Sequence, residues 1–174
     1  MGNKLAYVFF SLFILFSING CHWGGDMTHL DPLPPIDYIL VEKSKRTIRV
    51  YHKNEELRCY NISLGKNPVG HKKCEGDCRT PEGVYEISHK KDPYKYYKAL
   101  DLSYPNSEDR KAAQKRGVSP GGGVQIHGYE PKYNWVSQQH PLLDATRGCI
   151  LLTNPEMEQI FNATAVGTKI EIRP

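Results

Sequence analysis

Short apolar stretches that recur at close spacing constrain the fold of this chain more than any other feature. From Asp37 onward these stretches are rich in β-branched and aromatic residues, and most are too short for typical helices. The candidate strands are residues 38–41, 47–51, 59–64, 83–88, 99–102, 124–127, 150–152 and 169–172. The first two flank a polar connection, which predicts a β-hairpin. The sequence therefore predicts a mainly β domain of packed sheets, like a β-sandwich, with a few short helices.

Only two stretches carry the signals of helix ends. Ser107 is a capping residue before an acidic first turn, and the polar run that follows ends at Gly117. Asn154 is the expected cap of the second helix, with Pro155 at its first position. A length of 174 residues fits one domain with an N-terminal extra segment, so we expect the domain to span residues 37–174.

The N-terminus has the pattern of a secretory signal peptide, which we assign to residues 1–20. A single lysine precedes an apolar run from Leu5 to Ile18, which is shorter than the ~20 residues that span a bilayer. The run ends at Ile18-Asn19-Gly20-Cys21, which resembles the lipobox of bacterial lipoproteins and predicts lipidation of Cys21. A spanning anchor and ordinary cleavage without lipidation are the competing interpretations. Residues 21–36 contain several Gly and Pro, as is typical of a tether.

The overall charge excludes some classes of partner. A net charge of +4 is too small to indicate a nucleic-acid surface, and 24% charged residues do not fit a polytopic membrane protein. Together with the signal peptide, this predicts an exported protein of the periplasm or cell envelope, held at a membrane by its lipid anchor.

Cys149 has the context most favourable to chemistry among the five cysteines. It follows Gly148 and opens an apolar stretch, so the backbone can hold the sulfur at a cleft and aim two N–H groups at one point. A thiol needs a base or a positive field to become a strong nucleophile. His127, at the end of the strand 124–127 and just before Gly128, is the best candidate for that base. The spacing alone also fits a buried thiol and an unrelated surface histidine.

Several motifs in a fixed order make the chain resemble the L,D-transpeptidase (YkuD-type) catalytic domain over about residues 37–174. Within the family, the resemblance is closest to members with the motifs SPGG…IHG and TxGCI. The matching segments are Gly65 to Lys72, Glu75 to Asp77, Arg79 to Tyr85, Leu102 to Asn106 with Asp109, Gly117 to Gly128, and Thr146 to Cys149.

The resemblance implies that the Cys149 thiolate attacks a peptidoglycan stem peptide at the bond between an L-centre and D-alanine. By position, His127 is the base and the Gly128 carbonyl orients its imidazole. The amides of Gly148 and Cys149 form the oxyanion hole. An amine then resolves the thioester, which cross-links the wall or attaches a protein, such as a wall lipoprotein, to it. We expect no metal, no other cofactor and no nucleic-acid partner.

Two positions depart from the family pattern, which often has a histidine before the Gly-Cys pair and an arginine two residues after the cysteine. This chain has Arg147 and Leu151 there. Arg147 can pair with a substrate carboxylate or lower the thiol pKa, and a solvated surface arginine is the alternative. The candidate substrate-binding residues are Arg147, Thr146 and Tyr129.

Two other functions compete with this interpretation. A hydrolase would resolve the same thioester with water, as an L,D-carboxypeptidase or as an amidase that releases a wall-linked protein. A peptidoglycan-binding lipoprotein would keep the fold without the chemistry, and intact His127, Gly148 and Cys149 count against it.

The other cysteines lie outside the proposed site. An exported setting favours a local disulfide between Cys74 and Cys78, which would leave Cys59 unpaired and buried in its strand. A bridge from Cys59 to either of them is the alternative. A metal site of His71, Cys74 and Cys78 is weaker, because it lacks a fourth ligand.

The segment from Tyr129 to Asp144 is rich in aromatic residues and carries Tyr133, Trp135 and His140. It is expected either to close over the substrate as a lid or to pack on its own aromatic side chains.

Overall fold

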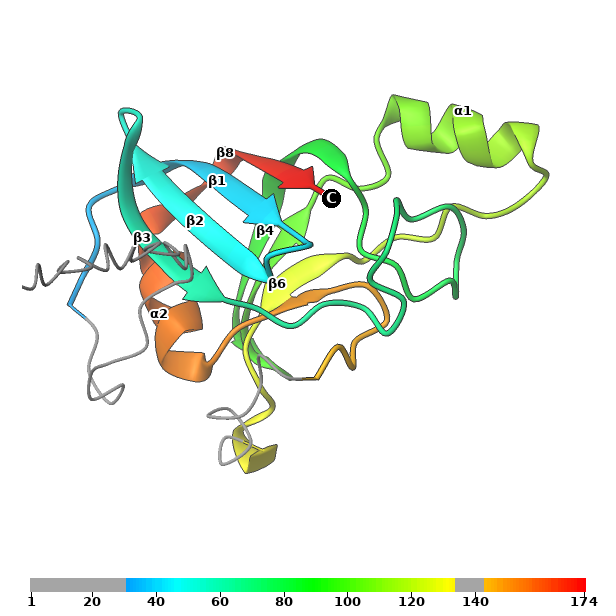
Figure 1. The fold of residues 1–174 in the computed structure, drawn as a ribbon. Helices are drawn as coiled ribbons and strands as arrows, with labels where there is room; N and C mark the ends of the chain where they lie inside the picture. Colours follow the sequence, from blue (N-terminus) through cyan, green and yellow to red (C-terminus); the bar gives the residue numbers. More distant parts are fainter. Residues whose placement is uncertain (1–30, 134–142) are drawn as a thin grey trace, which may run out of the picture.

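The computed structural model describes residues 31–133 and 143–174, which form a curled sheet with two helices (Figure 1). In chain order the elements are β1 (Ile36–Glu42), β2 (Thr47–His52), β3 (Glu55–Asn61), β4 (Gly83–Tyr94), β5 (Tyr97–Leu102), α1 (Ser107–Lys115), β6 (Gln125–His127), β7 (Ile150–Leu151), α2 (Asn154–Ala163) and β8 (Thr164–Arg173).

The eight strands follow the order β3-β2-β1-β8-β4-β5-β6-β7. β1 runs parallel to β8, and β6 runs parallel to β7, while the remaining pairs are antiparallel. The chain beyond β3 meets the other end of the sheet, because Ser63 pairs with Leu151 and Gly65 with Thr146. These bridges join the two edges, so the sheet is nearly closed on itself.

β4 connects the two halves of the sheet. Residues 83–86 pair with β8, and the rest of the strand pairs with β5. The register shifts between Ile87 and His89, which marks a bulge where the strand bends. Apolar side chains from both halves belong to one buried core, including Ile48, Val50, Leu100 and Ile126. The halves therefore share a single hydrophobic interior.

The two helices lie at different ends of the molecule (Figure 1). α2 buries Met157 and Ile160 in the core. α1 stands away from the sheet and is tied to it by Asp109, which accepts a 3.0 Å hydrogen bond from the Tyr85 hydroxyl. The other carboxylate oxygen of Asp109 lies 3.1 Å from Nε2 of His71. No helix within the described residues is long and apolar enough to cross a membrane.

The mainly β prediction is confirmed, as one continuous sheet that curls over its core. The third strand begins at Glu55 rather than at Cys59, because Lys53 and Asn54 adopt φ values of 46° and 68° and form a tight turn directly after β2. β4 and β8 are longer than the sequence predicts.

Both helices are confirmed, but each cap lies one residue earlier than predicted. Asn106 caps α1, with Asp109 completing a capping box. Thr153 caps α2, and Glu156 completes its box. Asn154 is therefore the first helical residue, and its side chain is available for another contact.

The predicted disulfide between Cys74 and Cys78 is wrong, because both are free thiols. Cys78 has a φ of 56°, and its Sγ lies 3.5 Å from the Gly76 carbonyl. Cys59 is disulfide-bonded and only partly buried, so the prediction of an unpaired, buried Cys59 is also wrong. The signal peptide, Cys21 and most of the tether lie outside the described residues.

Candidate active site

His127 ends β6, and Cys149 directly precedes the neighbouring strand β7. Ile126 pairs with Ile150, and His127 pairs with Leu151. Side chains alternate along a strand, so Ile126 and Ile150 enter the core while His127 and Leu151 share the opposite face. Cys149 comes two residues before Leu151. The β6 and β7 pairing thus brings together the two residues that the sequence predicts as nucleophile and base.

The sulfur of Cys149 lies against the segment that leads into β6. Its Sγ is 3.8 Å from the Gly123 carbonyl, and the backbone N–H of Gln125 donates to it. The Gln125 side chain is buried and donates a 2.6 Å hydrogen bond to Asp101 of β5. Asp101 in turn pairs with Lys91 at 2.8 Å. A row of polar contacts therefore runs across three strands and ends beside the thiol.

The imidazole of His127 has one defined tautomer. Its Nδ1 lies 2.7 Å from the carbonyl oxygen of Gly128, and a carbonyl can only accept a hydrogen bond. Nδ1 therefore carries the proton. In the neutral ring, Nε2 keeps its lone pair and can accept a proton from a thiol.

Tyr96 packs on the imidazole of His127. The ring centroids are 4.7 Å apart and the planes are inclined by 27°, which is a stacked arrangement. Tyr96 lies in the connection between β4 and β5, so this hairpin covers one face of the proposed base.

Burial favours the neutral forms of both groups. It raises the pKa of the Cys149 thiol, although the Gln125 N–H and the charge of Lys72 act in the opposite direction. Burial also lowers the pKa of His127, and the bond to Gly128 offsets this only in part. At neutral pH the pair therefore consists of a thiol and an uncharged imidazole, so proton transfer has to accompany attack.

The loop before Cys149 is held by the Thr146 side chain. Its hydroxyl donates to the Cys149 carbonyl at 2.8 Å and accepts from the Gly148 N–H at 3.0 Å. The Gly148 amide, predicted as an oxyanion donor, is thus engaged within the loop. The sequence predicts that Thr146 binds substrate. In the structure its hydroxyl stabilises the loop that leads to Cys149.

Three backbone segments meet so closely beside this loop that side chains are excluded. Gly148 has a φ of 127°, and a Cβ there would lie 2.5 Å from the Arg79 carbonyl oxygen. A Cβ at Gly65 would lie 2.1 Å from the Cys78 carbonyl oxygen and 3.0 Å from the Cα of Gly148. These two glycines permit the contact that positions the approach to Cys149.

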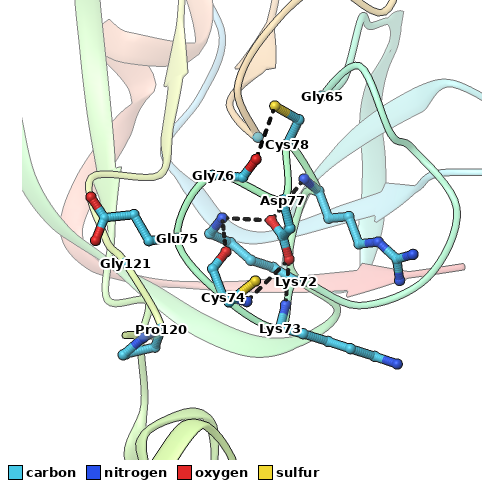
Figure 2. Close-up of polar contacts among 12 residues, drawn as sticks. Gly65, Lys72, Lys73, Cys74, Glu75, Gly76, Asp77, Cys78, Pro120 and Gly121 are labelled. Atoms are coloured by element: carbon cyan, nitrogen blue, oxygen red, sulfur yellow. Dashed lines mark hydrogen bonds and ion pairs between the residues drawn. The ribbon is translucent and has the colours of Figure 1, made fainter. Parts of the chain in front are cut away.

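Asp77 organises the loop that presses on Gly148 (Figure 2). Its carboxylate accepts from the ammonium of Lys72 at 2.8 Å and from the backbone N–H groups of Lys73, Cys74 and Arg79. Burial alone would raise the pKa of Asp77, but these donors outweigh it and lower the pKa to about 2. We call residues 72–79 the brace loop.

The brace loop also supports the segment that precedes β6. The backbone N–H of Glu75 donates to the Ser119 carbonyl at 2.8 Å, and the Ser119 hydroxyl donates to the Glu75 carboxylate. Figure 2 places Glu75 beside Pro120 and Gly121. The brace loop therefore contacts both the loop before Cys149 and the segment that leads into β6.

The remaining predicted site residues differ in their exposure. The Arg147 side chain is exposed, and Tyr129 is half-buried beside Gly128. Leu151, which stands where the family often has arginine, is buried and pairs with Ser63. The lid prediction for Tyr129 to Asp144 falls mostly on residues 134–142, including Trp135 and His140, which lie outside the described residues.

Sequence reasoning missed four contributors to the site: Tyr96, Gln125, Asn154 and the carboxylate of Asp77. Gln125 alternates with His127 along one strand, so its shared face could have been inferred. Tyr96 stacks on the imidazole, and Asn154 accepts from the nearby Tyr129 N–H. Both come from other elements, and no local spacing indicates either contact.

Residues 36–172 match the YkuD family, the L,D-transpeptidase catalytic domain, and the chain belongs to this family. YafK of Escherichia coli is 31% identical over 130 residues, which are 71% of this chain and 45% of that protein.

Solved structures support the same assignment. The helical cell shape determining protein Pgp2 of Campylobacter jejuni has a TM-score of 0.60 at 29% identity, over 80% of this chain and 48% of that one. An L,D-transpeptidase of Mycobacterium smegmatis shares the fold, with a TM-score of 0.53 at 18% identity over 79% of this chain and 58% of that one. The chain thus spans about half the length of the relatives it matches.

Proposed function

We propose that this chain is a cysteine-dependent L,D-transpeptidase that acts on peptidoglycan stem peptides, the substrates of its family. The observation that carries the proposal is the placement of His127 at the end of β6 and of Cys149 directly before the paired strand β7, with the Gly128 carbonyl holding the proton on Nδ1. That arrangement leaves Nε2 as the acceptor for the thiol proton.

In the proposed acylation step, Nε2 of His127 takes the proton from Cys149 as Sγ attacks the carbonyl carbon at the L-centre. The carbonyl π pair moves to oxygen and forms a tetrahedral oxyanion. When the oxyanion collapses, the C–N bond breaks, and the departing D-alanine amine receives the proton from His127. The product is a thioester on Cys149 with the imidazole neutral again.

The thioester is resolved by an acceptor amine, from another stem peptide or from a wall lipoprotein. The amine attacks the thioester carbon and gives its proton to His127, and the C–S bond then breaks. The sulfur leaves as thiolate and recovers the proton. No net oxidation or cofactor is required.

The oxyanion is proposed to bind the backbone amides of Cys149 and Gly148. Because the Gly148 N–H donates to Thr146 Oγ1, that amide exchanges its partner when the oxyanion forms. The Thr146 hydroxyl keeps its bond to the Cys149 carbonyl during this exchange.

We also propose that the chain is exported to the cell envelope and anchored by a lipid on Cys21. The lipobox-like sequence at residues 18–21 supports this, and the wall substrate requires export.

The test is intact-protein mass spectrometry of the purified chain after incubation with disaccharide-tetrapeptide muropeptides. Wild type should gain the mass of the muropeptide minus that of the released D-alanine, and Cys149→Ala should not. Cys78→Ala is the matched control, because Cys78 is another free thiol beside the same loop, and it should still form the adduct.

The products then separate the rival functions. Cross-linked dimers at saturating acceptor support the transpeptidase. An adduct followed only by shortened stems would make the chain a hydrolase, and a wild type without adduct or turnover would overturn the enzymatic proposal.

A further inference from the structure

One peptide unit next to His127 is held at both of its polar ends. The carbonyl of the Gly128-Tyr129 peptide accepts the proton of His127 Nδ1 at 2.7 Å. The N–H of the same peptide donates to Oδ1 of Asn154 at 2.6 Å. Asn154 is thus linked to the imidazole through a single rigid, planar group.

Asn154 is well placed to hold this peptide. It is buried, with 8% of its surface exposed, at the first turn of α2. The cap of α2 is Thr153, whose side chain bonds with Glu156. The helix therefore does not need the Asn154 side chain as its cap, although the sequence suggests that role.

The Asn154 side chain occupies the place that a side chain at position 128 would need. A Cβ there would lie 2.4 Å from Asn154 Oδ1, while its next neighbours would be at 3.4 Å. Gly128 is not among the glycines with positive φ, so its backbone does not itself demand glycine. The absence of a side chain at 128 makes room for the Asn154 amide.

Other hydrogen bonds fix the backbone around His127, but they do not set the plane of the Gly128-Tyr129 peptide. The His127 carbonyl accepts from the Leu152 N–H at 3.1 Å, and the Gly128 N–H donates to the Lys98 carbonyl at 3.3 Å. Both bonds belong to the peptide on the other side of Gly128. The orientation of the Gly128-Tyr129 peptide is held on its N–H side by Asn154.

We propose that Asn154 is a positioning residue, which sets the tautomer and the orientation of His127 through the Gly128-Tyr129 peptide. A donated N–H polarises the peptide and makes its carbonyl a stronger acceptor for Nδ1–H. If the peptide rotates, Nδ1 loses its acceptor and the proton can move to Nε2, which then cannot accept the thiol proton. The inference rests on the proposed role of His127 as the base.

Three variants test the link. Asn154→Ala removes the acceptor, and Asn154→Asp keeps an oxygen in its place. Thr153→Ala is the matched control, because it weakens the cap of the same helix and leaves the peptide contact intact.

The readouts do not depend on a wall substrate. Nitrogen-15 NMR of the His127 ring reports the tautomer, and iodoacetamide alkylation of Cys149 across pH reports the base. Asn154→Ala should show the Nε2–H tautomer and slower alkylation at pH 7. We expect a loss of about tenfold or more, with the ~10²–10⁴ that a general base supplies as its upper limit. Asn154→Asp should keep the wild-type tautomer and rate. Thr153→Ala should lower the melting temperature and change neither.

An unchanged tautomer and pH profile in Asn154→Ala would overturn the inference, as would equal losses in Asn154→Ala and Thr153→Ala. These results are separate from the proposed function. If wild type fails to process stem peptides while Asn154→Ala still shifts the tautomer, the transpeptidase proposal fails and the positioning role stands.

Discussion

At the scale of single residues, the reactivity of Cys149 depends on where its proton goes. Because burial raises the pKa of the thiol and lowers that of His127, neither group is charged at neutral pH. The charge appears only when Sγ attacks, and the proton then needs an acceptor within the site.

Alkylation of Cys149 should therefore follow the titration of His127. In wild type we expect the rate to rise as pH climbs through the lowered pKa of His127, below about 6.5, and then level off. His127→Ala should slow the reaction at pH 7 by roughly 10²–10⁴ and move its rise above the ordinary range of a thiol pKa. Iodoacetamide kinetics from pH 5 to 10 measure this. His89→Ala, at an exposed histidine of β4, should match wild type.

Gly148 should not tolerate a side chain. Gly148→Ala forces a Cβ to within 2.5 Å of the Arg79 carbonyl at a φ of 127°, so the loop must move. Strain of this kind costs on the order of 1–3 kcal/mol, and the nucleophile should lose most of its reactivity. Urea unfolding and alkylation kinetics report the two effects. Gly167→Ala has a φ of 91° but meets no atom within 4 Å, so it should destabilise less and leave the thiol reactive. Equal effects of the two variants would refute the close-contact argument.

At the scale of elements, the brace loop carries its own electrostatic stabilisation. The pKa of Asp77, about 2, lies below its ordinary value of 3.8, so the ionised carboxylate stabilises the fold above pH 4. This contribution is lost as the pH falls from about 4 to about 2.

Asp77→Asn should reveal that contribution. We expect a loss of about 1–3 kcal/mol in the free energy of unfolding at pH 7, as for hydrogen bonds to a charged group. The difference from wild type should shrink toward pH 2, where the wild-type carboxyl is protonated. Urea titrations at several pH values measure it. Glu108→Gln removes an exposed partner of Lys111 and should change stability by less than about 0.5 kcal/mol. A constant difference between Asp77→Asn and wild type at all pH values would contradict the prediction.

The elements show how far sequence reasoning reaches. Alternation predicts the β1 and β2 hairpin, because its apolar residues face one core. The motif around His127 and Cys149 likewise predicts the central pair. Thr153 and Asn154 are both good caps. Thr153 takes that role in a capping box with Glu156, whereas Asn154 binds the Tyr129 N–H, a partner that is distant in sequence. The Asp77 carboxylate accepts the hydrogen bonds that stabilise the brace loop. The spacing of Cys74 and Cys78 alone could not show that this loop is held without a disulfide.

At the scale of the whole molecule, the proposed lipid anchor at Cys21 predicts where the chain is found in the cell. We expect wild type in the membrane fraction and Cys21→Ala in the soluble envelope fraction, because a diacyl anchor gives stable attachment. Fractionation with immunoblotting measures this, and Cys78→Ala should remain with the membranes.

The mass of the mature chain before and after reduction gives an independent check. A lipid on Cys21 would add a mass that reduction does not remove. A soluble wild type without lipid mass would contradict the anchor.

The strand that follows Cys149, β7, lies between two partners, β6 and the segment that follows β3. Leu151 exchanges both backbone hydrogen bonds with Ser63, while β7 also pairs with β6. The amide proton of Leu151 should exchange with deuterium only through global unfolding. Formation of such distant contacts is slow, so the part of Cys149 reactivity that depends on His127 should appear only late in folding. The appearance of this reactivity would then mark the end of folding.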